Sequence, residues 1–488
     1  MSRRRGVGSV PCIQFDRESD IPFYVQIYDG YRGAIISGQL APGQRLPSTR
    51  TISEQLEISR FPTLSAFEQL LDDGYIVGRV GSGTFVRDQI PEDLIKPISL
   101  RKPASAFDRS SPRLPESDEW SSREKVGPFR VGVPALDRFP GKVFARLVQR
   151  HALTASPEAM AYSDPAGYPP LREAIAEYLR TTRAGTCDAS QVLIVTGSQM
   201  GLVMSAMALT TPDTLVCVEE PGYPGIRQAM GLSNAQVIGV GVDDGGIDVA
   251  AIKRITDTVK VVCVTPARQF PLGPAMEVTR RLELLNWAAA HDAWVIEDDY
   301  DSEFLYSRRP LGALQGMGNS DQVVYVGTFS KVMFPAMRLG YIVVPPALIG
   351  RFVEIRKALD ICPPMLYQLV LTDFMNEGHL GRHILRMRGV YLARRNALLS
   401  AIHAHASDVL VPGNSDAGLH LVAYLPDGVD DQEVVKRACE RGLYPQALST
   451  CYAGYAARPG LILGFGGSDE CAFPGAVSTL AEIIRGMR

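Results

Sequence analysis

Hydrophobic residues near the start of the chain recur at the spacing of an α-helix. Ile27, Tyr31 and Ile35 follow each other at four-residue intervals, and Gly38 comes directly after them. This pattern predicts an amphipathic helix that buries one face and ends at a glycine C-cap.

Two further helical patterns follow the first. In residues 48–56, Ser48 is a candidate N-cap, and Thr51 with Glu54 has the spacing of a capping box. A third helix is expected before Gly74, with Pro62 as its first residue, because proline lacks an N–H and disfavours helical geometry at the residue before it. The predicted apolar face of this helix comprises Leu64, Phe67, Leu70 and Leu71.

Residues 75–86, "YIVGRVGSGTFV", alternate as two short β-type runs around a glycine-rich turn. Three helices followed by a hairpin is the order of a winged helix-turn-helix, whose third helix enters the major groove of DNA. We therefore expect a DNA-binding domain at residues 15–88.

After the hairpin the periodicity stops and later returns in another form. Residues 89–126 are rich in proline, serine and charge, which predicts a flexible linker. From residue 127 to 488, helical segments alternate with short apolar runs, which predicts an α/β domain with a mainly parallel sheet. These runs are "QVLIVTG", "DTLVCVEEPGY", "AQVIGVGV", "VVCVTP", "AWVIEDDY", "VVYVGTF" and "LGYIVVP".

The composition of the chain says less about its function than the hydrophobic pattern does. The formal net charge is −3, and in the first 87 residues ten arginines oppose nine acidic residues, so any DNA binding must depend on where the charges lie. We find no apolar run long enough to cross a bilayer and no signal-peptide segment after the N-terminal arginines, so we expect a cytoplasmic protein. The eight cysteines lack the spacing of a zinc site or a disulfide framework, and we expect no metal site.

Polar residues follow several of the predicted strands, at the sheet edge where ligands of such folds bind. Gly197, Ser198 and Gln199 would begin a helix whose free N–H groups favour a phosphate. Tyr223 follows another strand and could cover a flat ligand. Asp298, Asp299 and Tyr300 end a third, and Lys331 lies one strand-helix-strand unit beyond them.

Lys331 is the candidate nucleophile. Partial burial near other cations would lower the pKa of its amine and allow a Schiff base with an aldehyde, while Thr328, Ser330 and Arg338 would lie near a phosphate. The alternative is a loop lysine with no chemical role. A phosphate cradle, an aromatic ring, a carboxylate and a lysine in this order fit pyridoxal 5′-phosphate (PLP).

These residues also resemble a known family. The stretches "LAPGQRLPSTR" and "GYIVGRVGSGTFV" resemble a GntR-type winged helix, and "YSDPAGYPPLREAIAEYL", "EDDYDSEF" and "TFSKVMFPAMRLGY" resemble a fold-type I PLP-dependent aminotransferase. Together they are similar to the MocR-type transcription regulators. The resemblance implies a head-to-tail homodimer that binds operator DNA.

The resemblance also implies roles for individual residues. Lys331 would form the Schiff base (an aldimine), Asp298 would pair with the pyridinium nitrogen, Tyr300 would bond the phenolic oxygen and Tyr223 would stack on the ring. Asp298 is preferred to Asp299 only by counting back from the tyrosine. The phosphate would be held by Gly197, Ser198, Gln199, Thr328, Ser330 and Arg338, with Tyr162 from the other subunit. The DNA contacts would be Arg45, Arg50, Ser59, Arg60 and Gly81, although each could be a solvated surface group.

The sequence departs from the family at two places that bear on function. Arg268 stands where the family usually has histidine, so it adds a cation near the cofactor or effector, or it points to solvent. At the position where aminotransferases carry an arginine that clamps the substrate carboxylate, this chain has Leu461, with Arg458 three residues earlier. The missing clamp weakens the expectation of efficient transamination.

The hypothesis from sequence is a PLP-dependent transcription regulator that senses an amino compound, or PLP, through a Lys331 aldimine. Arg227, Arg268 and Arg458 are its candidate effector contacts. One alternative is an active PLP-dependent aminotransferase with an appended DNA-binding domain. Another is a core without PLP that serves only as a dimerisation scaffold.

Overall fold

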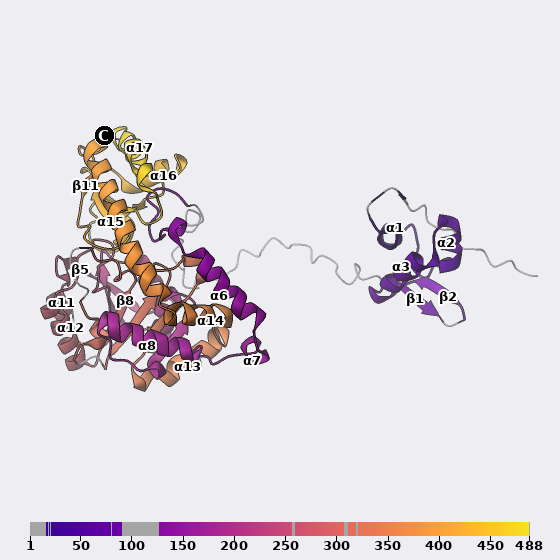
Figure 1. Cartoon of the computed structure of the whole chain (residues 1–488), viewed down its shortest axis with the longest axis horizontal. Coiled ribbons are helices and arrows are strands. Elements are labelled where there is room, and N and C mark those ends of the chain that lie inside the picture. Colours follow the sequence, from indigo (N-terminus) through magenta and orange to yellow (C-terminus); the bar gives the residue numbers. More distant parts are fainter. Residues whose placement is uncertain are drawn as a thin grey trace, which may run out of the picture. The chain divides into compact units, whose positions relative to one another are not determined.

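The computed structural model describes residues 16–17, 19, 21–79, 81–89, 126–255, 259–306, 311–318 and 321–487. The chain divides into two compact units, residues 1–111 and 112–488, which are described separately below (Figure 1). Residues 90–125, most of the expected linker, lie outside the described residues. No helix in the described ranges is both long enough and apolar enough to span a bilayer.

The N-terminal unit has the element order expected of a winged helix. Its elements are α1 (Phe23–Ile36), α2 (Thr49–Leu56), α3 (Arg60–Asp72), β1 (Ile76–Arg79) and β2 (Gly83–Val86), and the two strands pair antiparallel. Ile27, Tyr31 and Ile35 are buried as the spacing predicts, and Gly38 adopts a φ of 76° just after α1. The core forms between α1 and α3, where the rings of Tyr31 and Phe67 meet edge to face at 5.1 Å.

The third helix differs from expectation in its start and in its buried face. It begins at Arg60, with Ser59 as N-cap, so the expectation that Pro62 is its first residue is wrong. Proline is tolerated there because the N–H groups of the first turn have no partner within the helix. Thr63, Ala66, Phe67 and Leu70 are buried, whereas Leu64 and Leu71 are 37% and 38% exposed, which corrects the expected apolar face.

The second helix begins as expected but without the expected capping box. Ser48 is the N-cap, and its side chain accepts a hydrogen bond from the backbone N–H of Thr51 at 3.1 Å. Thr51 lies inside the first turn and therefore cannot cap the helix, and Glu54 accepts from Nε of Arg50 instead. The spacing of Thr51 and Glu54 was misleading because the cap lies three residues earlier.

The second unit is built on an eight-stranded sheet in the order β3-β10-β9-β8-β7-β4-β5-β6. All seven apolar runs form strands in it, and only β10 and β6 run antiparallel to their neighbours. The strands are β3 (Val192–Val195), β4 (Leu215–Glu220), β5 (Gln236–Asp243), β6 (Gly246–Ile247), β7 (Val259–Val264), β8 (Trp294–Asp299), β9 (Val323–Thr328) and β10 (Gly340–Val343). The expectation of a mainly parallel sheet is confirmed.

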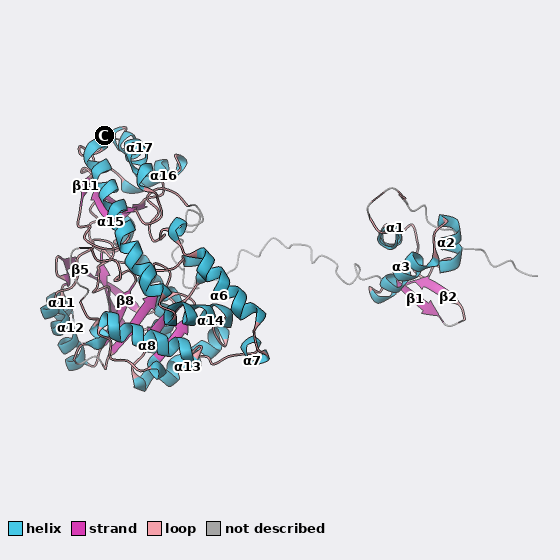
Figure 2. Ribbon diagram, viewed as in Figure 1, coloured by secondary structure: helices cyan, strands magenta, loops and turns pink. Residues whose placement is uncertain are grey.

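Helices cover both faces of this sheet (Figure 2). Successive strand residues alternate between faces: Ile296 packs in the cluster that includes α9 residues, and its neighbour Val295 packs with residues of α12. The helices are α6 (Gly141–Leu153), α7 (Pro157–Met160), α8 (Pro169–Arg183), α9 (Ser198–Leu209), α10 (Pro224–Gly231), α11 (Val249–Ile255), α12 (Val278–His291), α13 (Ile349–Asp360) and α14 (Met365–Asn376). Burial on both faces explains why the strands are continuous apolar runs.

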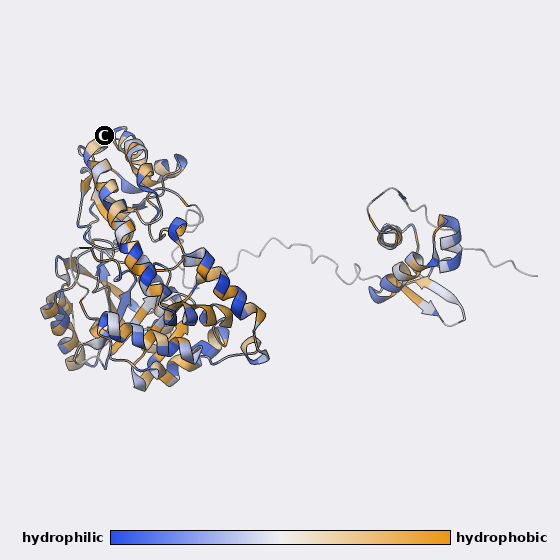
Figure 3. Cartoon of the chain, in the orientation of Figure 1, coloured by the Kyte–Doolittle hydropathy of each residue, from blue (hydrophilic) through white to orange (hydrophobic). Residues whose placement is uncertain are grey.

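A second, antiparallel sheet follows toward the C-terminus, in the order β11-β12-β14-β13. Its strands are β11 (Val411–Pro412), β12 (His420–Tyr424), β13 (Gln446–Ala447) and β14 (Gly460–Gly464). It packs with α15 (His379–His405), α16 (Asp431–Glu440) and α17 (Phe473–Arg485), and α15 and α6 carry hydrophilic and hydrophobic residues in turn (Figure 3). The second unit therefore has a large and a small layered part.

Replacing Ser48 by alanine tests the cap of α2. The substitution leaves the first-turn N–H of Thr51 without its side-chain acceptor, and we expect the free energy of unfolding of the winged helix to fall by about 1 kcal/mol. Urea unfolding of the N-terminal unit measures the change. Ser65→Ala, inside α3, is the matched control and should be neutral or slightly stabilising, since alanine has the higher helix propensity. An equal loss in both variants would contradict the cap.

Candidate functional site

The predicted site residues come together because three strands end at the same edge of the large sheet. Asp298 of β8 pairs with Val326 of β9 in the parallel register. Gly340 of β10 pairs with Thr328 on one side and with Val195 on the other. The ends of β3, β8 and β9 therefore bring their following loops side by side.

The start of α9 forms an anion cradle with Arg338. Gly197 is the N-cap of α9 with a φ of 86°, and a Cβ placed on it would lie 2.9 Å from Nη1 of Arg338. Arg338, with a φ of 51°, donates from Nη2 to the Thr196 carbonyl at 2.7 Å. The free N–H groups that begin at Ser198 and this guanidinium give the cradle a positive potential.

The hydroxyls of Thr328 and Ser330 lie beside this cradle. Thr328 donates from Oγ1 to Oγ of Ser330 at 3.1 Å, and the Ser330 N–H bonds back to Thr328 Oγ1 at 3.1 Å. Gly340, which pairs with Thr328, comes close to the Ser198 N–H, because a Cβ on Gly340 would lie 3.1 Å from that nitrogen. The structure thus groups five of the predicted phosphate residues, namely Gly197, Ser198, Thr328, Ser330 and Arg338.

Lys331 points into the second unit rather than into solvent. It is half-buried, and its Nζ donates to the carbonyl of Gly132 at 2.8 Å. Gly132 has a φ of 81°, and a Cβ on it would lie 2.6 Å from the lysine nitrogen. The loop at Gly132 therefore approaches the lysine more closely than a residue with a side chain could.

The two neighbouring carboxyls at the end of β8 have different surroundings. Asp299 forms an ion pair with Arg183 at 2.8 Å and accepts from Ser302 and Tyr325. Asp298 is also buried, but its Oδ1 has no hydrogen-bond partner. Burial raises the pKa of Asp298 to about 7, with the Asp299 charge adding to the shift and the Lys331 cation opposing it. Of these two carboxyls, Asp298 is the one with a buried oxygen that has no hydrogen-bond partner among the described residues.

Aromatic side chains form one wall of the site. The ring of Phe270 meets the rings of Tyr223 and Tyr300 edge to face, at 5.6 and 6.0 Å between centroids. Gln199 reaches the same wall, because its Nε2 donates to the Gly225 carbonyl at 2.9 Å and a Cβ on Gly225 would touch both Gln199 and the Tyr223 ring. Tyr223 and Tyr300 therefore face a common apolar cluster, to which Val422 and Ile462 of the small sheet also belong.

Arg268 lies inside the molecule, so the solvent-facing alternative is wrong. It is 2% exposed, and its Nη1 donates to Oη of Tyr300 and to Oδ2 of Asp301, both at 3.2 Å. Its Nη2 donates to the His420 carbonyl at 2.7 Å, and burial together with the arginine charge lowers the pKa of His420 well below its usual value. His420 is therefore neutral, and Arg268 holds a fixed positive charge against the Tyr300 hydroxyl.

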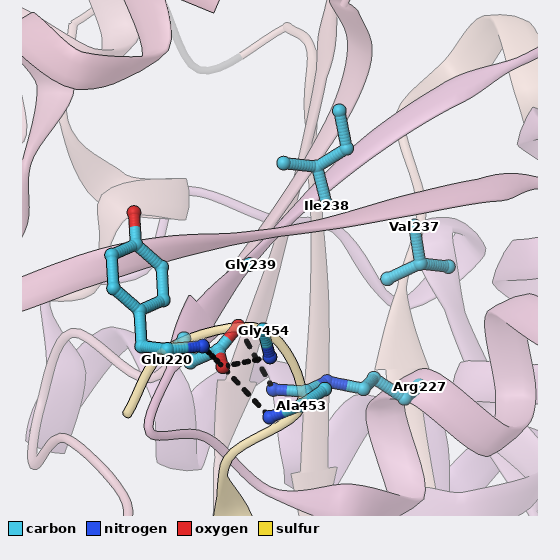
Figure 4. Close-up of a pocket in the computed structure, with 8 residues that line it drawn as sticks. Glu220, Arg227, Val237, Ile238, Gly239, Ala453 and Gly454 are labelled. Atoms are coloured by element: carbon cyan, nitrogen blue, oxygen red, sulfur yellow. Dashed lines mark hydrogen bonds and ion pairs between the residues drawn. The ribbon is translucent and has the colours of Figure 1, made fainter. Parts of the chain in front are cut away.

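Arg227 borders a pocket of about 390 Å³, which is also lined by Glu220, by residues 237–239 of β5 and by residues 453–455 (Figure 4). Its Nη2 lies 3.6 Å from Oε2 of Glu220 and donates to the Cys451 carbonyl at 3.4 Å. Oε1 of Glu220 accepts from the backbone N–H groups of residues 453–455 at 2.6 to 2.9 Å. Burial alone would raise the pKa of Glu220, but these hydrogen bonds and the Arg227 charge lower it, so the side chain is a carboxylate. This carboxylate connects the end of β4 to the loop before β14.

The third candidate effector contact, Arg458, stacks over the ring of Tyr424 at 3.6 Å. Tyr424 and Cys451 belong to the cluster of Phe270 and Tyr300. Arg227, Arg268 and Arg458 therefore each contact a member of one cluster, namely Cys451, Tyr300 and Tyr424. Leu461 is fully buried in β14 and contributes no charge.

Tyr162 lies two residues beyond α7 and is 82% exposed in the single chain. Its role in the cradle of a second subunit stays a prediction.

In the winged helix, the predicted DNA contacts are exposed at the starts of α2 and α3 and in the wing. Arg60 joins the two helix starts, because its Nη2 lies 3.5 Å from Oγ1 of Thr49. Arg45 reaches the wing, where a Cβ on Gly83 would lie 3.0 Å from its Nε. The remaining three are Arg50, which pairs with Glu54, Ser59, which is the N-cap of α3, and Gly81, which has a φ of 72° between β1 and β2.

Two residues of the site were missed by sequence reasoning. Gly132 lies in a loop without a motif, and Arg183 occupies the last turn of an ordinary amphipathic helix, α8. Both act on residues more than a hundred positions away, Lys331 and Asp299. No local signal could have identified them.

Comparisons with known proteins divide the chain as the structure does. Residues 129–459 match the model for aminotransferase class I and II, and residues 23–86 match that for bacterial regulatory proteins of the gntR family. The chain is 34% identical to the "Probable rhizopine catabolism regulatory protein MocR" of Rhizobium meliloti, over 95% of this chain and 94% of that protein. It is 30% identical to the pyridoxine biosynthesis transcriptional regulator PdxR of Corynebacterium glutamicum, over 94% of this chain and 95% of that protein.

Solved aminotransferases share the fold of the second unit. Kynurenine aminotransferase of Pyrococcus horikoshii superposes with a TM-score of 0.72 at 26% identity, covering 78% of this chain and 97% of that one. LysN of Thermus thermophilus, an α-aminoadipate aminotransferase, gives a TM-score of 0.71 at 25% identity, covering 77% of this chain and 96% of that one.

Replacing Arg183 by methionine tests the ion pair beneath the site. The substitution leaves the Asp299 carboxyl buried without its cation, and we expect the free energy of unfolding of the second unit to fall by about 3–5 kcal/mol. Urea unfolding measures this loss. The control is Arg180→Met, one turn earlier on α8, where the arginine pairs with Glu177 at the surface and should contribute less than about 1 kcal/mol. Similar losses in both variants would contradict the structural role of Arg183.

Proposed function

Because this chain belongs to the MocR-type transcription regulators, which join a GntR-type winged helix to an aminotransferase class I and II domain, we propose that it regulates transcription by sensing an amino compound, or PLP itself, through Lys331. The observation that carries the proposal is the buried Asp298 carboxyl with an unpaired oxygen, at the edge of the sheet that also holds Lys331 and the cradle at Gly197.

The residues at this edge fit PLP. A buried carboxyl oxygen without a partner is costly, and a protonated ring nitrogen would satisfy it, while the helix start suits a phosphate. When bound, PLP supplies an aldehyde that combines reversibly with amines and a ring that withdraws electrons. Lys331 supplies the amine that holds the cofactor, and the Arg268 charge keeps the Tyr300 hydroxyl oriented.

The remaining residues position the cofactor. Tyr223 would cover its ring, and Tyr300 would bond its phenolic oxygen. The phosphate would be held by Gly197, Ser198, Gln199, Thr328, Ser330 and Arg338, with Tyr162 contributed by a second subunit. The exposure of Tyr162 supports this last assignment, because a single chain leaves its ring in solvent.

The winged helix is the part of the chain that would bind the operator DNA. We place Arg45, Arg50, Ser59, Arg60 and Gly81 against the operator, with α3 in the major groove and the hairpin along the backbone. A head-to-tail homodimer would present two such heads to two half-sites, as expected for a symmetric regulator. Because a regulator of transcription acts on the chromosome, we propose that the protein is cytoplasmic.

For the effector to act as a switch, it must bind two states of the second unit with different affinity, commonly by about 1–3 kcal/mol. The cluster of Phe270 and Tyr300 joins the large and small sheets, and Arg227, Arg268 and Arg458 border it. An amino compound at Lys331 that also contacts one of these arginines would change how the two sheets pack. The linker would pass this change to the DNA-binding heads.

An active aminotransferase is the second candidate function, supported by the class I and II fold. Against it stands Leu461, which is apolar where a substrate carboxylate clamp would be expected. Arg458, three residues earlier, is engaged with the Tyr424 ring but is exposed and could reach a substrate. Turnover is therefore the property that separates the two functions.

Lys331→Ala tests the sensor directly. We expect the purified variant to lose the visible absorption of bound PLP and its effector response, while operator binding without effector is retained, since the winged helix is a separate unit. Absorbance and operator titrations with and without effector measure both properties. Lys142→Ala, an exposed lysine of α6, is the control and should behave as the parent protein. A Lys331→Ala protein with unchanged regulation would refute sensing through this residue.

Adding amines and amino acids to the purified protein separates the candidate functions. We expect an effector to convert the visible absorption band to a new, persistent species, because nothing at Leu461 orients a carboxylate for rapid turnover. The spectrum recorded over time is the measurement. Steady conversion to the pyridoxamine form, with release of keto acid, would favour the enzyme. A colourless protein that does not bind added PLP would favour the scaffold.

A further inference from the structure

Phe61 is a large apolar side chain left in solvent at the start of α3. It is the second residue of the helix and is 77% exposed, whereas Phe67, six residues later, is buried in the core. Leu64, one turn beyond Phe61, is also exposed. The two form a short apolar stripe on the side of α3 opposite to the buried Thr63, Ala66 and Leu70.

The position of Phe61 follows from where the helix starts. Ser59 is the N-cap and Arg60 the first helical residue, so Phe61 lies in the first turn and is followed in sequence by Pro62. In a helix-turn-helix, the residues at the N-terminal end of the second helix of the motif contact base edges in the major groove. Here that helix is α3, which follows α2 across a short turn.

The exposed ring lies beside a positive charge, that of Arg60, at the N-terminal end of α3. Arg60 precedes Phe61 and reaches the first turn of α2 through Thr49, so two helix N-termini and a guanidinium lie close to it. Arg50 is also exposed on the first turn of α2, where its Nε pairs with Glu54 at 2.9 Å. An apolar protein surface docked on Phe61 would desolvate these charges, whereas DNA phosphates would neutralise them. The charge therefore favours DNA as the occupant.

We propose that Phe61 reads a thymine in the operator through its methyl group. The C5-methyl of thymine is the apolar group on the major-groove edge of the base pairs, and phenylalanine is among the side chains that contact it. Phe61 would favour T·A at one position of each half-site, while Arg60 and Arg50 hold the neighbouring backbone. This inference rests on DNA binding by the winged helix and adds a specificity-determining residue to it.

Removing only the thymine methyl tests the contact. The full-length protein selects a duplex from a random pool, and each thymine of that duplex is then replaced in turn by deoxyuridine, which keeps the base pairing. One buried methyl contributes about 0.8 kcal/mol, so we expect one substitution per half-site to weaken binding about 4-fold. Phe61→Ala should bind the selected duplex more weakly, and it should bind the thymine and uracil duplexes equally.

Matched variants make the test specific. Leu71→Ala removes an exposed apolar side chain about 15 Å further along the same helix, and it should keep both the affinity and the methyl sensitivity of the parent. Phe61→Leu should retain part of the sensitivity. Because Phe61 is exposed, its replacement should leave the unfolding of the unit unchanged, which circular dichroism checks.

Three results would overturn the proposal while leaving DNA binding by the winged helix intact. In the first, Phe61→Ala discriminates thymine from uracil as well as the parent does. In the second, no thymine of the selected duplex is sensitive to loss of its methyl. In the third, Phe61→Ala changes only the association state of the protein, which would assign the ring to a protein contact. If the parent enriches no duplex at all, DNA binding fails and the contact fails with it.

Discussion

The parallel pairing of β8 with β9 is the constraint on which the site depends. In this register Asp298 lies opposite Val326 and Asp299 opposite Gly327, so consecutive carboxyls point to opposite faces of one sheet. A shift of one residue would exchange them. The pairing thus decides which carboxyl meets Arg183 and which keeps an unpaired oxygen. It also sets where β9 delivers Lys331.

Burial at the strand ends explains the distribution of charge around the site. Removal from water raises the pKa of a carboxyl unless hydrogen-bond donors or cations offset the effect of burial. Burial raises the pKa of Glu297 to about 7 and that of Asp301 to about 6. Both oxygens of Glu297 accept backbone N–H groups at 3.1 Å, and Oδ2 of Asp301 meets Arg268 at 3.2 Å. One buried oxygen each of Asp298, Asp301 and Glu219 has no hydrogen-bond partner in the described part of the chain. Asp298 differs from Asp301 in having no ion pair with an arginine of the described ranges, which leaves its carboxyl available to a ligand.

Regular elements were predictable because their signals are local. Seven apolar runs became strands, since a strand buried on both faces needs a continuous apolar run, and the helices of the winged helix followed their spacing. The errors were local too. Thr51 and Glu54 have the spacing of a capping box but lie inside a helix that Ser48 already caps. Leu64 is apolar yet exposed, because the packing of α3 against α1, and not hydropathy, selects the buried face.

The sequence by itself determined the order of the elements, the separation into a winged helix and an α/β domain, and which strand ends carry polar groups. These features follow from the periodicity of helices and strands and from the residues after each apolar run, all of which can be read along the chain. Tertiary structure alone decided which of those groups meet. Lys331 finds the carbonyl of Gly132, and Asp299 finds Arg183, across large separations in sequence. Arg268 likewise meets Tyr300, to which its guanidinium donates a hydrogen bond, only because the folded chain brings their loops together. Such contacts depend on the packing of distant segments, for which a single sequence carries no periodic signal.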